Sequence, residues 1–387
     1  MKPRLAAALF AAALAAAPAR ADEPSLTWVD ASSSPRAGST SGLGDLDQEL
    51  LARCGTPEEG LMAVARRVVA AKAAGRPTPD VDGLVLEMRA SGEPHVWPRA
   101  WVVSAEAFER DATKKRLDAW RQSFGDGGER RCGLARVAVP GGQVMAAIAV
   151  DALADMAPLP VRARTGQWLE LEARMRVPAT SAKVVLVGPG GAPRTVPTSF
   201  QDGRVRARFA LDRPGAFDVQ VLADVAAGPR PVLEARVYAD VEPPRAAPKA
   251  AAPGEDAAAG LTGAPALAAM IDAVRRERSL PALTRDPRRD ALALAHARRM
   301  REVRTVAHDV GDGDPGQRVQ NAGLSAKEAG ENVAHSESVR LAHRSLWQSP
   351  SHRANLERPQ FTHVGVAVVD DPDGTVWVCE IFATSLR

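Results

Sequence analysis

Gly330-Glu331-Asn332-Val333-Ala334-His335 is followed, a few residues later, by Trp347-Gln348-Ser349-Pro350-Ser351-His352-Arg353-Ala354-Asn355-Leu356. These two runs bring an acid, amides and imidazoles into one short part of the chain. Histidine is rare before them, because His95 is the only one that precedes His296. Carboxylates and imidazoles ligate cations and transfer protons, so a functional site is expected here.

The second run has the pattern of a helix start. Ser349 is a natural N-cap and Pro350 fits the first helical position, which places His352 in the first turn. The positive end of the helix dipole disfavours an imidazolium there, so His352 is expected to be neutral. Ser349 and Ser351 are then capping residues rather than nucleophiles.

A further imidazole, His308, lies upstream in a polar loop rich in glycine and aspartate. The aspartates of this loop lack the closing glutamate of an EF-hand, so a plain surface loop is expected for them. Two neutral imidazoles and one carboxylate match a zinc site with one open position. The candidate metal ligands are therefore His308, Glu331 and His352, which only the fold could bring together.

Residues 267–382 resemble the bacterial branch of the CAP superfamily, whose domains are also called SCP-like or pathogenesis-related-1-like. The resemblance rests on an ordered series of features: a helix that ends near Met300, then His308, Gly330-Glu331-Asn332, the run from Trp347 to Leu356, Val364-Gly365-Val366 and Trp377-Val378. It implies an α-β-α sandwich with a cleft lined by two histidines and glutamates. In some family members this cleft holds a divalent metal.

Carried over residue by residue, the resemblance matches His308, Glu331 and His352. It implies a weakly held divalent metal, zinc or magnesium. The glutamate that follows the tryptophan in the eukaryotic pattern is missing, because Pro350 has its place; Glu337 or His335 is an alternative fourth ligand. Four residues are expected to support the cleft: Asn332, Trp347, Arg353 and Asn355.

Structural roles are expected for several of these side chains. Asn355 is expected to bond backbone groups, and Arg353 to pair with a nearby acid. His343 lies four residues before Trp347 on one helical face and is expected to be a packed structural residue. His296 and His363 have no motif support and are expected to be structural or exposed.

The first residues of the chain predict export. Lys2 and Arg4 precede a short apolar stretch and a small-residue cleavage site, so residues 1–21 form an expected signal peptide. No later apolar run is long enough for a membrane helix. The formal net charge of +3 is mild and the basic residues are dispersed, which argues against a nucleic-acid partner. The expected location is extracellular or periplasmic.

Three cysteines in an oxidising compartment leave at least one without a partner. We expect Cys54 to pair with Cys132, because both fall in one predicted domain, and Cys379 to be a buried strand thiol. The alternative is that all three are reduced and buried.

The predicted domain order has five parts after the signal peptide. Residues 22–44 form a flexible leader in which 26–29 could add a short strand, and 45–157 form an N-terminal α+β domain. Residues 158–241 show strict alternation between apolar and polar side chains, which predicts an immunoglobulin-like β-sandwich. Residues 242–262 form a linker rich in proline and alanine, and 263–387 the CAP-like domain.

The N-terminal domain is expected to be a degenerate copy of the C-terminal one. Trp120-Arg121-Gln122-Ser123 precedes an apolar hairpin much as Trp347-Gln348-Ser349 does, and the N-terminal segment lacks the polar motif. The alternative is shared α/β patterning without common ancestry.

Three classes of function compete. The first is an exported, non-catalytic binding module whose cleft takes a metal, a lipid or a cell-envelope component. The second is a metal-assisted hydrolase in which Glu331 polarises water between His308 and His352. The third is a purely structural envelope protein. We favour binding, because no nucleophile arrangement stands out in the sequence.

Overall fold

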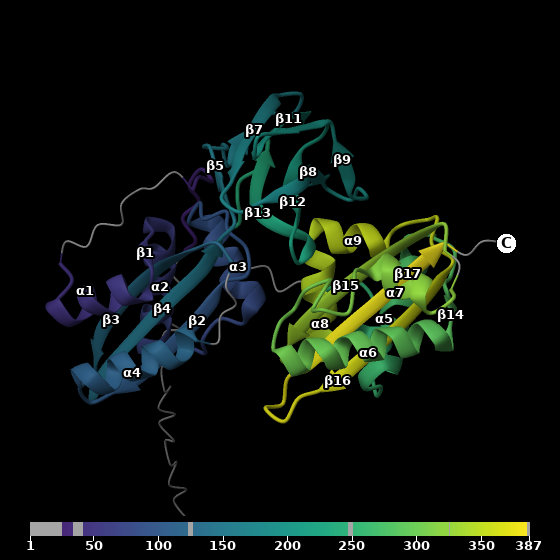
Figure 1. The fold of residues 1–387 in the computed structure, drawn as a ribbon. Helices are drawn as coiled ribbons and strands as arrows, with labels where there is room; N and C mark the ends of the chain where they lie inside the picture. The colour runs from purple at the N-terminus through teal and green to yellow at the C-terminus, as the bar shows by residue number, and fades with distance from the viewer. Residues whose placement is uncertain (1–24, 34–41, 123–126, 247–250, 325, 385–387) are drawn as a thin grey trace, which may run out of the picture.

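The computed structural model describes residues 25–33, 42–122, 127–246, 251–324 and 326–384. Figure 1 shows three parts: an N-terminal and a C-terminal domain, each with helices on a sheet, and a middle domain made of strands. The predicted signal peptide, 1–21, lies outside the described residues. Among the residues described, no helix is long and apolar enough to cross a membrane.

The C-terminal domain is one sheet with helices on both faces. The strand order is β14-β16-β17-β15, in which β14 runs parallel to β16 and the other pairs are antiparallel. Helices α5 and α8 pack on one face of the sheet, and α6 and α7 on the other. Its elements, in chain order, are η1 (Glu255–Ala258), α5 (Gly263–Glu277), β14 (Thr284–Arg285), α6 (Pro287–Val303), α7 (Pro315–Asn321), β15 (Glu328–Ser336), α8 (Val339–Gln348), α9 (Pro350–Leu356), β16 (His363–Asp370) and β17 (Val376–Thr384).

The N-terminal domain is built in the same way. Helices α1 and α4 cover one face of its sheet, and α2 and α3 cover the other. A disulfide joins Cys54, at the end of α1, to Cys132 on β3, with 5.9 Å between the two Cα atoms. Its elements are α1 (Asp45–Cys54), β1 (Thr56–Pro57), α2 (Glu59–Ala73), α3 (Val81–Ala90), β2 (Arg99–Ala105), α4 (Arg110–Arg121), β3 (Glu129–Val139) and β4 (Gly142–Ala152).

The two sheets share strand order, strand direction and register. The N-terminal order is β1-β3-β4-β2, again with one parallel pair, β1 with β3. Gly133 and Gly365 have the same place in the two sheets and the same steric task. A Cβ at Gly133 would lie 2.0 Å from the backbone carbon of Leu61 in α2, and one at Gly365 would lie 2.2 Å from that of Arg289 in α6. Only glycine allows these helices to approach so closely.

The shared register shows what stands at equivalent positions. Ile148 and Ile381 pair with the two glycines, and on the other side they pair with Ala100 and Glu331. The position of the buried acid Glu331 is therefore held by alanine in the N-terminal domain. The helices compare in the same way. Val68 of α2 lies seven residues after Leu61, and His296 of α6 lies seven residues after Arg289, so valine stands where the other domain has histidine.

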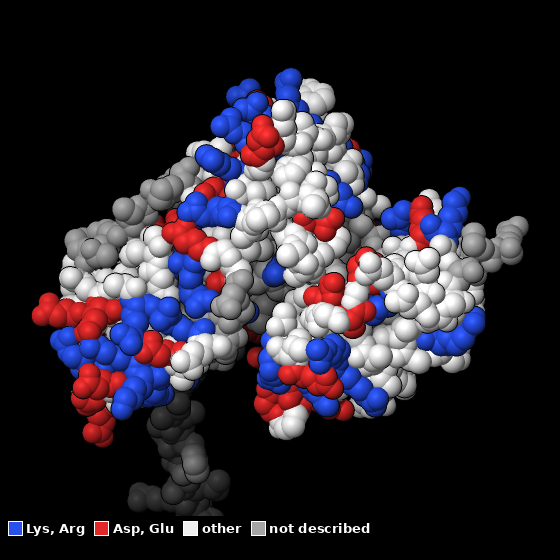
Figure 2. Space-filling view, in the orientation of Figure 1, with Lys and Arg blue, Asp and Glu red and all other residues white. Residues whose placement is uncertain are grey.

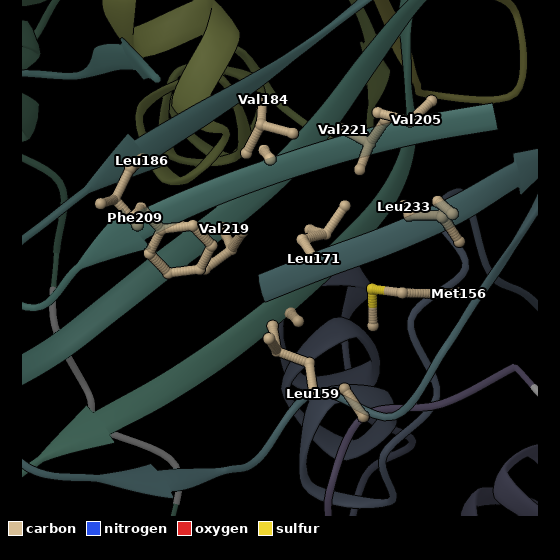
Figure 3. Packing of buried hydrophobic residues seen from close by; sticks show 14 of the residues in the cluster. Met156, Leu159, Leu171, Val184, Leu186, Val205, Phe209, Val219, Val221 and Leu233 are labelled. Carbon is tan, nitrogen blue, oxygen red and sulfur yellow. The ribbon is translucent and has the colours of Figure 1, made fainter. Parts of the chain in front are cut away.

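The middle domain consists of two sheets that share one apolar core. The sheet orders are β10-β11-β7-β5 and β6-β13-β12-β8-β9, and the core side chains between them are shown in Figure 3. Strand β5 precedes residue 158, so this domain begins earlier than the sequence predicted. Its strands are β5 (Ala154–Met156), β6 (Arg162–Ala163), β7 (Trp168–Met175), β8 (Ala179–Val187), β9 (Arg194–Val196), β10 (Thr198–Gln201), β11 (Arg204–Ala210), β12 (Gly215–Val225) and β13 (Gly228–Ala239).

Buried and exposed side chains alternate along these strands, as the sequence predicted. In β7 every second side chain is buried and those between are exposed, because one face of the strand packs against the opposite sheet. Charged side chains of both signs are dispersed over the face seen in Figure 2.

The leader predicted for residues 22–44 contains an anchored segment. Leu26 and Trp28 are buried in a cluster with Tyr238, and the Trp28 indole donates to the backbone oxygen of Pro244 at 2.8 Å. Residues 26–29 form no strand; their apolar side chains are held by packing between the N-terminal and middle domains instead.

The linker predicted for residues 242–262 also packs in part. The turn η1 lies against α5 and α8, where the Glu255 carboxylate binds the guanidinium of Arg344 at 2.6 Å. Ala258 joins the apolar core of the C-terminal domain. The second half of the predicted linker is therefore part of that domain, because its small side chains fit between two helices.

Candidate functional site

Glu331 is the central acid of the candidate site. It lies on β15 and is buried, because β15 runs beneath the loop that follows α6. The Nδ1 of His308 is 2.8 Å from Glu331 Oε1, and the guanidinium of Arg318, on α7, binds Oε2. Both carboxylate oxygens are therefore engaged by side chains of the same domain.

A second imidazole, His296, stands behind this pair. It is fully buried on α6, where its Nε2 contacts the backbone oxygen of Ala307 at 3.0 Å and lies 3.7 Å from Glu331 Oε1. Its Nδ1 is 2.7 Å from Asp312. His296 is thus a structural residue, as predicted, but within the site. The expectation of a plain surface loop is wrong for Asp312, because this carboxylate pairs with His296 and with Arg318 at 3.5 Å.

These contacts keep Glu331 ionised. Burial alone would raise its pKa, but the hydrogen bond to His308 and the charge of Arg318 outweigh burial and lower the pKa. An ionised carboxylate only accepts hydrogen bonds, so His308 presents its Nδ1 proton to Glu331. In the neutral form of this ring, the lone pair is at Nε2. Glu331 orients His308 rather than facing a ligand itself.

His352 comes from the other side of the site, in the first turn of α9, as predicted. Two amides hold this turn against β15. The amide of Asn332 donates to the backbone oxygen of His352 at 3.2 Å, and Asn355 donates to the side chain of Asn332 at 2.9 Å. Asn355 also donates to the backbone oxygen of Glu331 at 3.1 Å. Asn332 and Asn355 therefore position the two sides of the site relative to each other.

The start of α9 is capped by the middle domain. Ser349 occupies the N-cap position but its side chain makes no capping bond, which differs from the predicted role. Instead, Gln220 on β12 accepts the backbone N–H of Ser351 at 2.9 Å and donates to the Ser349 hydroxyl at 3.1 Å. The expectation was wrong because a cap from another domain cannot be detected from local sequence.

The His352 ring is neutral. Burial lowers its pKa to about 3, and the nearby His308 adds to the decrease. In the described part of the chain, the ring has no hydrogen-bond partner. A neutral imidazole without a protein partner remains available to a ligand.

His308 and His352 line one small cavity of about 20 Å³. Residues from all three domains enclose it: Trp97, Ala227, Arg230, Pro231, Val306, Ala307, His308, Val333 and His352. The hairpin between β12 and β13 approaches so closely that a Cβ at Gly228 would lie 3.1 Å from the Cβ of His308. Other domains therefore form part of the wall of the C-terminal domain's cleft.

Two of the predicted supporting residues lie elsewhere. Arg353 pairs with Glu357 at 3.0 Å, which agrees with the predicted ion pair, and its guanidinium lies 4.1 Å from the ring centre of Trp347. Arg353 also donates to the backbone oxygen of Gly191 in the middle domain at 2.9 Å. Trp347 and Arg353 fix α9 and do not line the cavity.

The remaining histidines are also away from the cavity. His335 stacks on Trp377 with 4.2 Å between ring centres, so it is not a fourth member of the site. His343 is buried and contacts the backbone oxygen of Pro253 at 2.9 Å, which agrees with a packed structural role. His363 contacts the hydroxyl of Thr362 at 2.8 Å.

The predicted three-ligand metal set is only partly assembled. His308 and His352 face one cavity, whereas Glu331 is engaged by Arg318 and is not part of the cavity lining. Over the described ranges, no group of three or more His, Cys, Asp or Glu side chains is placed to hold a metal ion. A site of three protein ligands therefore does not fit these residues.

Sequence reasoning missed Arg318, Gln220, Arg230 and the central place of His296. His296 had a detectable signal, because it follows Ala293 by three residues and precedes Met300 by four on the buried stripe of α6. Arg318, Gln220 and Arg230 carried no local signal, since each acts on the site through tertiary contacts.

Comparison with known proteins identifies the domain that carries the two imidazoles. Residues 268–381 match the family model described as CAP, the cysteine-rich secretory protein family. Residues 268–381 are a CAP domain. The chain also matches an uncharacterized protein, YkwD, from Bacillus subtilis strain 168, with 30% identity over 110 residues. That match spans 28% of this chain and 42% of the Bacillus protein, less than two thirds of its length.

Solved structures also resemble parts of the chain. An outer surface protein of Borrelia burgdorferi is 22% identical with a TM-score of 0.30, and the likeness covers 31% of this chain and 90% of that one. An extracellular protein of Bacillus anthracis that contains an SCP domain is 18% identical with a TM-score of 0.30. That likeness covers 56% of this chain and 82% of the Bacillus anthracis chain.

Proposed function

We propose that this protein is an exported, non-catalytic binding protein that uses its CAP cleft to hold a component of the bacterial cell envelope. The observation that carries the proposal is the cavity at which His308 and His352 meet side chains of two other domains. Two imidazoles at a hollow shared by three domains suit ligand recognition, because such junctions are common places for binding sites.

Two features favour binding over hydrolysis. The acid that would polarise water, Glu331, is engaged by Arg318 and His308 and does not line the cavity. The nearby thiol, Cys379, is buried 3.6 Å from Glu331, and burial raises its pKa well above the ordinary value. A thiol in that state is a poor nucleophile.

The binding proposal is tested by co-sedimentation of the mature full-length protein with purified peptidoglycan and with phosphatidylglycerol vesicles. The double variant His308→Ala, His352→Ala is expected to lose most of the binding to one of these. His363→Ala is the matched control, because its ring lies away from the cavity, and it should bind as the wild type does. Equal binding by all three proteins contradicts the proposal, as does release of soluble fragments that depends on the two histidines.

A weakly held divalent ion, zinc or magnesium, stays a prediction, with His308 and His352 as its two protein ligands. Calorimetric titration with Zn²⁺ of the wild type, His308→Ala and His352→Ala measures it. Heats that are identical for the three proteins exclude the ion from the cleft. Loss of the heat in both variants supports a site that water molecules complete.

We also propose that the N-terminal domain is a degenerate CAP-like copy and that the middle domain is immunoglobulin-like. Support for the copy is the shared register around Gly133 and Gly365, with alanine in place of Glu331 and valine in place of His296. In this reading the N-terminal copy has kept the fold and lost the polar site, and it now contributes Trp97 to the cleft of the other copy.

A further inference from the structure

Arg230 is a cation in the cavity wall without an anionic partner. It belongs to β13 and is half-buried, and in the described residues it forms no ion pair or hydrogen bond. Its guanidinium lies over Trp97 of the N-terminal domain, with 5.8 Å between the guanidinium carbon and the ring centre. A half-buried guanidinium loses hydration that a cation–π contact only partly replaces.

The charges around Arg230 do not neutralise it. Asp151, the carboxylate whose charge acts on Arg230, is already paired with Arg130 at 3.1 Å. Arg99 lies close enough for its positive charge to act on Arg230. On the opposite side, Glu331 is paired with Arg318. The guanidinium of Arg230 therefore gives the cavity wall a positive charge, which favours an anion.

The two imidazoles add directional groups. His308 points its Nδ1 proton at Glu331, so its Nε2 accepts a hydrogen bond in the neutral ring. His352 has no partner for its ring among the described residues and supplies one N–H. Together with Arg230, the cavity offers two kinds of donor and one acceptor.

We propose that the open side of this cavity binds a phosphate group that carries one proton, as in hydrogen phosphate or a phosphomonoester, because the cavity volume of about 20 Å³ has room for about one phosphate oxygen. Arg230 and His352 donate to its anionic oxygens, His308 accepts its hydroxyl, and Trp97 orients the guanidinium. Planar guanidinium groups suit such oxyanions. This inference rests on the proposed function, since it names the ligand chemistry of the same cleft.

The middle domain contains a matched arginine that lacks these surroundings. The guanidinium carbon of Arg208 lies 5.7 Å from the ring centre of Trp168, much as Arg230 lies over Trp97. Trp168 is 63% exposed, so this pair stands on an open strand face where water solvates the guanidinium. Arg208→Gln therefore removes an arginine of the same kind without touching the cavity.

The experiment follows the ring signals of the seven histidines of the full-length mature protein by NMR while inorganic phosphate is added. We expect saturable shifts of the His308 and His352 signals, with the His335 signal unchanged. Arg230→Gln is expected to weaken phosphate affinity by about tenfold or more, because a charged hydrogen bond is lost. Arg208→Gln should bind as the wild type does.

Two further ligands sharpen the test. Sulfate has the same shape but no proton near neutral pH, so it should bind more weakly than phosphate. Methyl phosphate should bind as phosphate does if the natural ligand is a phosphomonoester, and only inorganic phosphate should bind if the cavity takes the free ion. Both of these outcomes support the proposal.

Three results overturn the proposal: a response that does not saturate, equal phosphate affinity in Arg230→Gln, or equal affinity for sulfate. Arg230→Lys guards against misfolding, because it keeps the charge and should retain part of the affinity. If phosphate does not bind, but binding to peptidoglycan or vesicles still depends on the histidines, only this inference is wrong and the proposed function stands. If phosphate binds and both envelope materials fail, the envelope ligand is wrong and the phosphate site stands.

Discussion

Gln220 of the middle domain caps the helix that carries His352: its Oε1 accepts the N–H of Ser351 at 2.9 Å. The same amide donates to Glu234 at 2.6 Å, and Glu234 binds Arg89 of the N-terminal domain at 3.0 Å. A continuous polar chain thus connects the N-terminal domain to the first turn of α9. The position of His352 depends on contacts that its own domain does not provide.

Replacement of Gln220 by alanine should loosen this connection. Gln220 is fully buried, so its loss leaves the Ser351 N–H and one Glu234 oxygen without their partner, at a cost of about 1–2 kcal/mol. We expect faster amide hydrogen exchange at residues 351–353 and a lower urea midpoint. Gln201→Ala, at an exposed position of the same domain, is the control. Unchanged exchange in α9 contradicts the capping role.

Arg318→Gln should be among the most destabilising substitutions in the CAP domain. It leaves the buried Glu331 carboxylate without its cation, which costs about 3–5 kcal/mol at neutral pH. The double variant Arg318→Gln, Glu331→Gln removes both charges and should recover much of the loss in urea denaturation. A double variant no more stable than Arg318→Gln alone shows that Arg318 acts through packing rather than charge.

Glu380 gives the CAP domain a pH dependence of known sign. This acid is fully buried on β17, and burial raises its pKa from the ordinary 4.5 to about 8, although a hydrogen bond from Asn332 opposes the rise. The folded state thus holds a proton that the unfolded state releases between these values. Stability is fully supported below pH 4.5 and falls as the pH rises to about 8, by at most about 1.4 kcal/mol per pH unit.

Glu380→Gln should remove this dependence, because the amide keeps the shape and needs no proton. The variant should gain stability over the wild type at pH 8 and little at pH 5, as measured by urea denaturation at both pH values. Glu170→Gln, on an exposed strand face, is the control. A gain of the same size at both pH values contradicts the explanation.

Reduction of the Cys54–Cys132 disulfide should destabilise the N-terminal domain. The bond spans 78 residues, and closing a loop of that length is worth about 4.5 kcal/mol in the chain-entropy account. Calorimetry with a reducing agent should show a lower transition temperature for this domain and a smaller change for the CAP domain. Cys379→Ala serves as the control, because that thiol forms no disulfide in the structure.

Much of the fold was predictable where the pattern is local. The alternation in β7, the capped start of α6 at Asp286-Pro287 and the hairpin of β3 and β4 all follow from period and turn residues. Strand β2 was missed because only its Val102 and Val103 are β-branched. Helix α3 was missed because its N-cap, Asp80, lies in a proline-rich stretch and Gly83 stands in its first turn.

The candidate site was predictable only as far as its motifs reach. His308 contacts Glu331 and shares a cavity with His352, and the amides of Asn332 and Asn355 support them. Arg230 and Gln220 lie on strands whose apolar and polar side chains alternate in the usual way. Their contacts with the site form only where the domains meet. Local sequence patterns predict the helix or strand that a segment forms. They do not predict which side chains of that segment contact another domain.

The cavity contains the two histidines of the CAP domain, but residues of the other two domains close it: Trp97, Ala227 and Arg230. An excised CAP domain would expose His308 and His352 to bulk water and would lose the aromatic ring and the guanidinium together. Ligand preferences measured on single-domain relatives or on a fragment of this chain would therefore describe a different receptor. Cutting at the domain boundary alters the specificity of this cleft rather than isolating it.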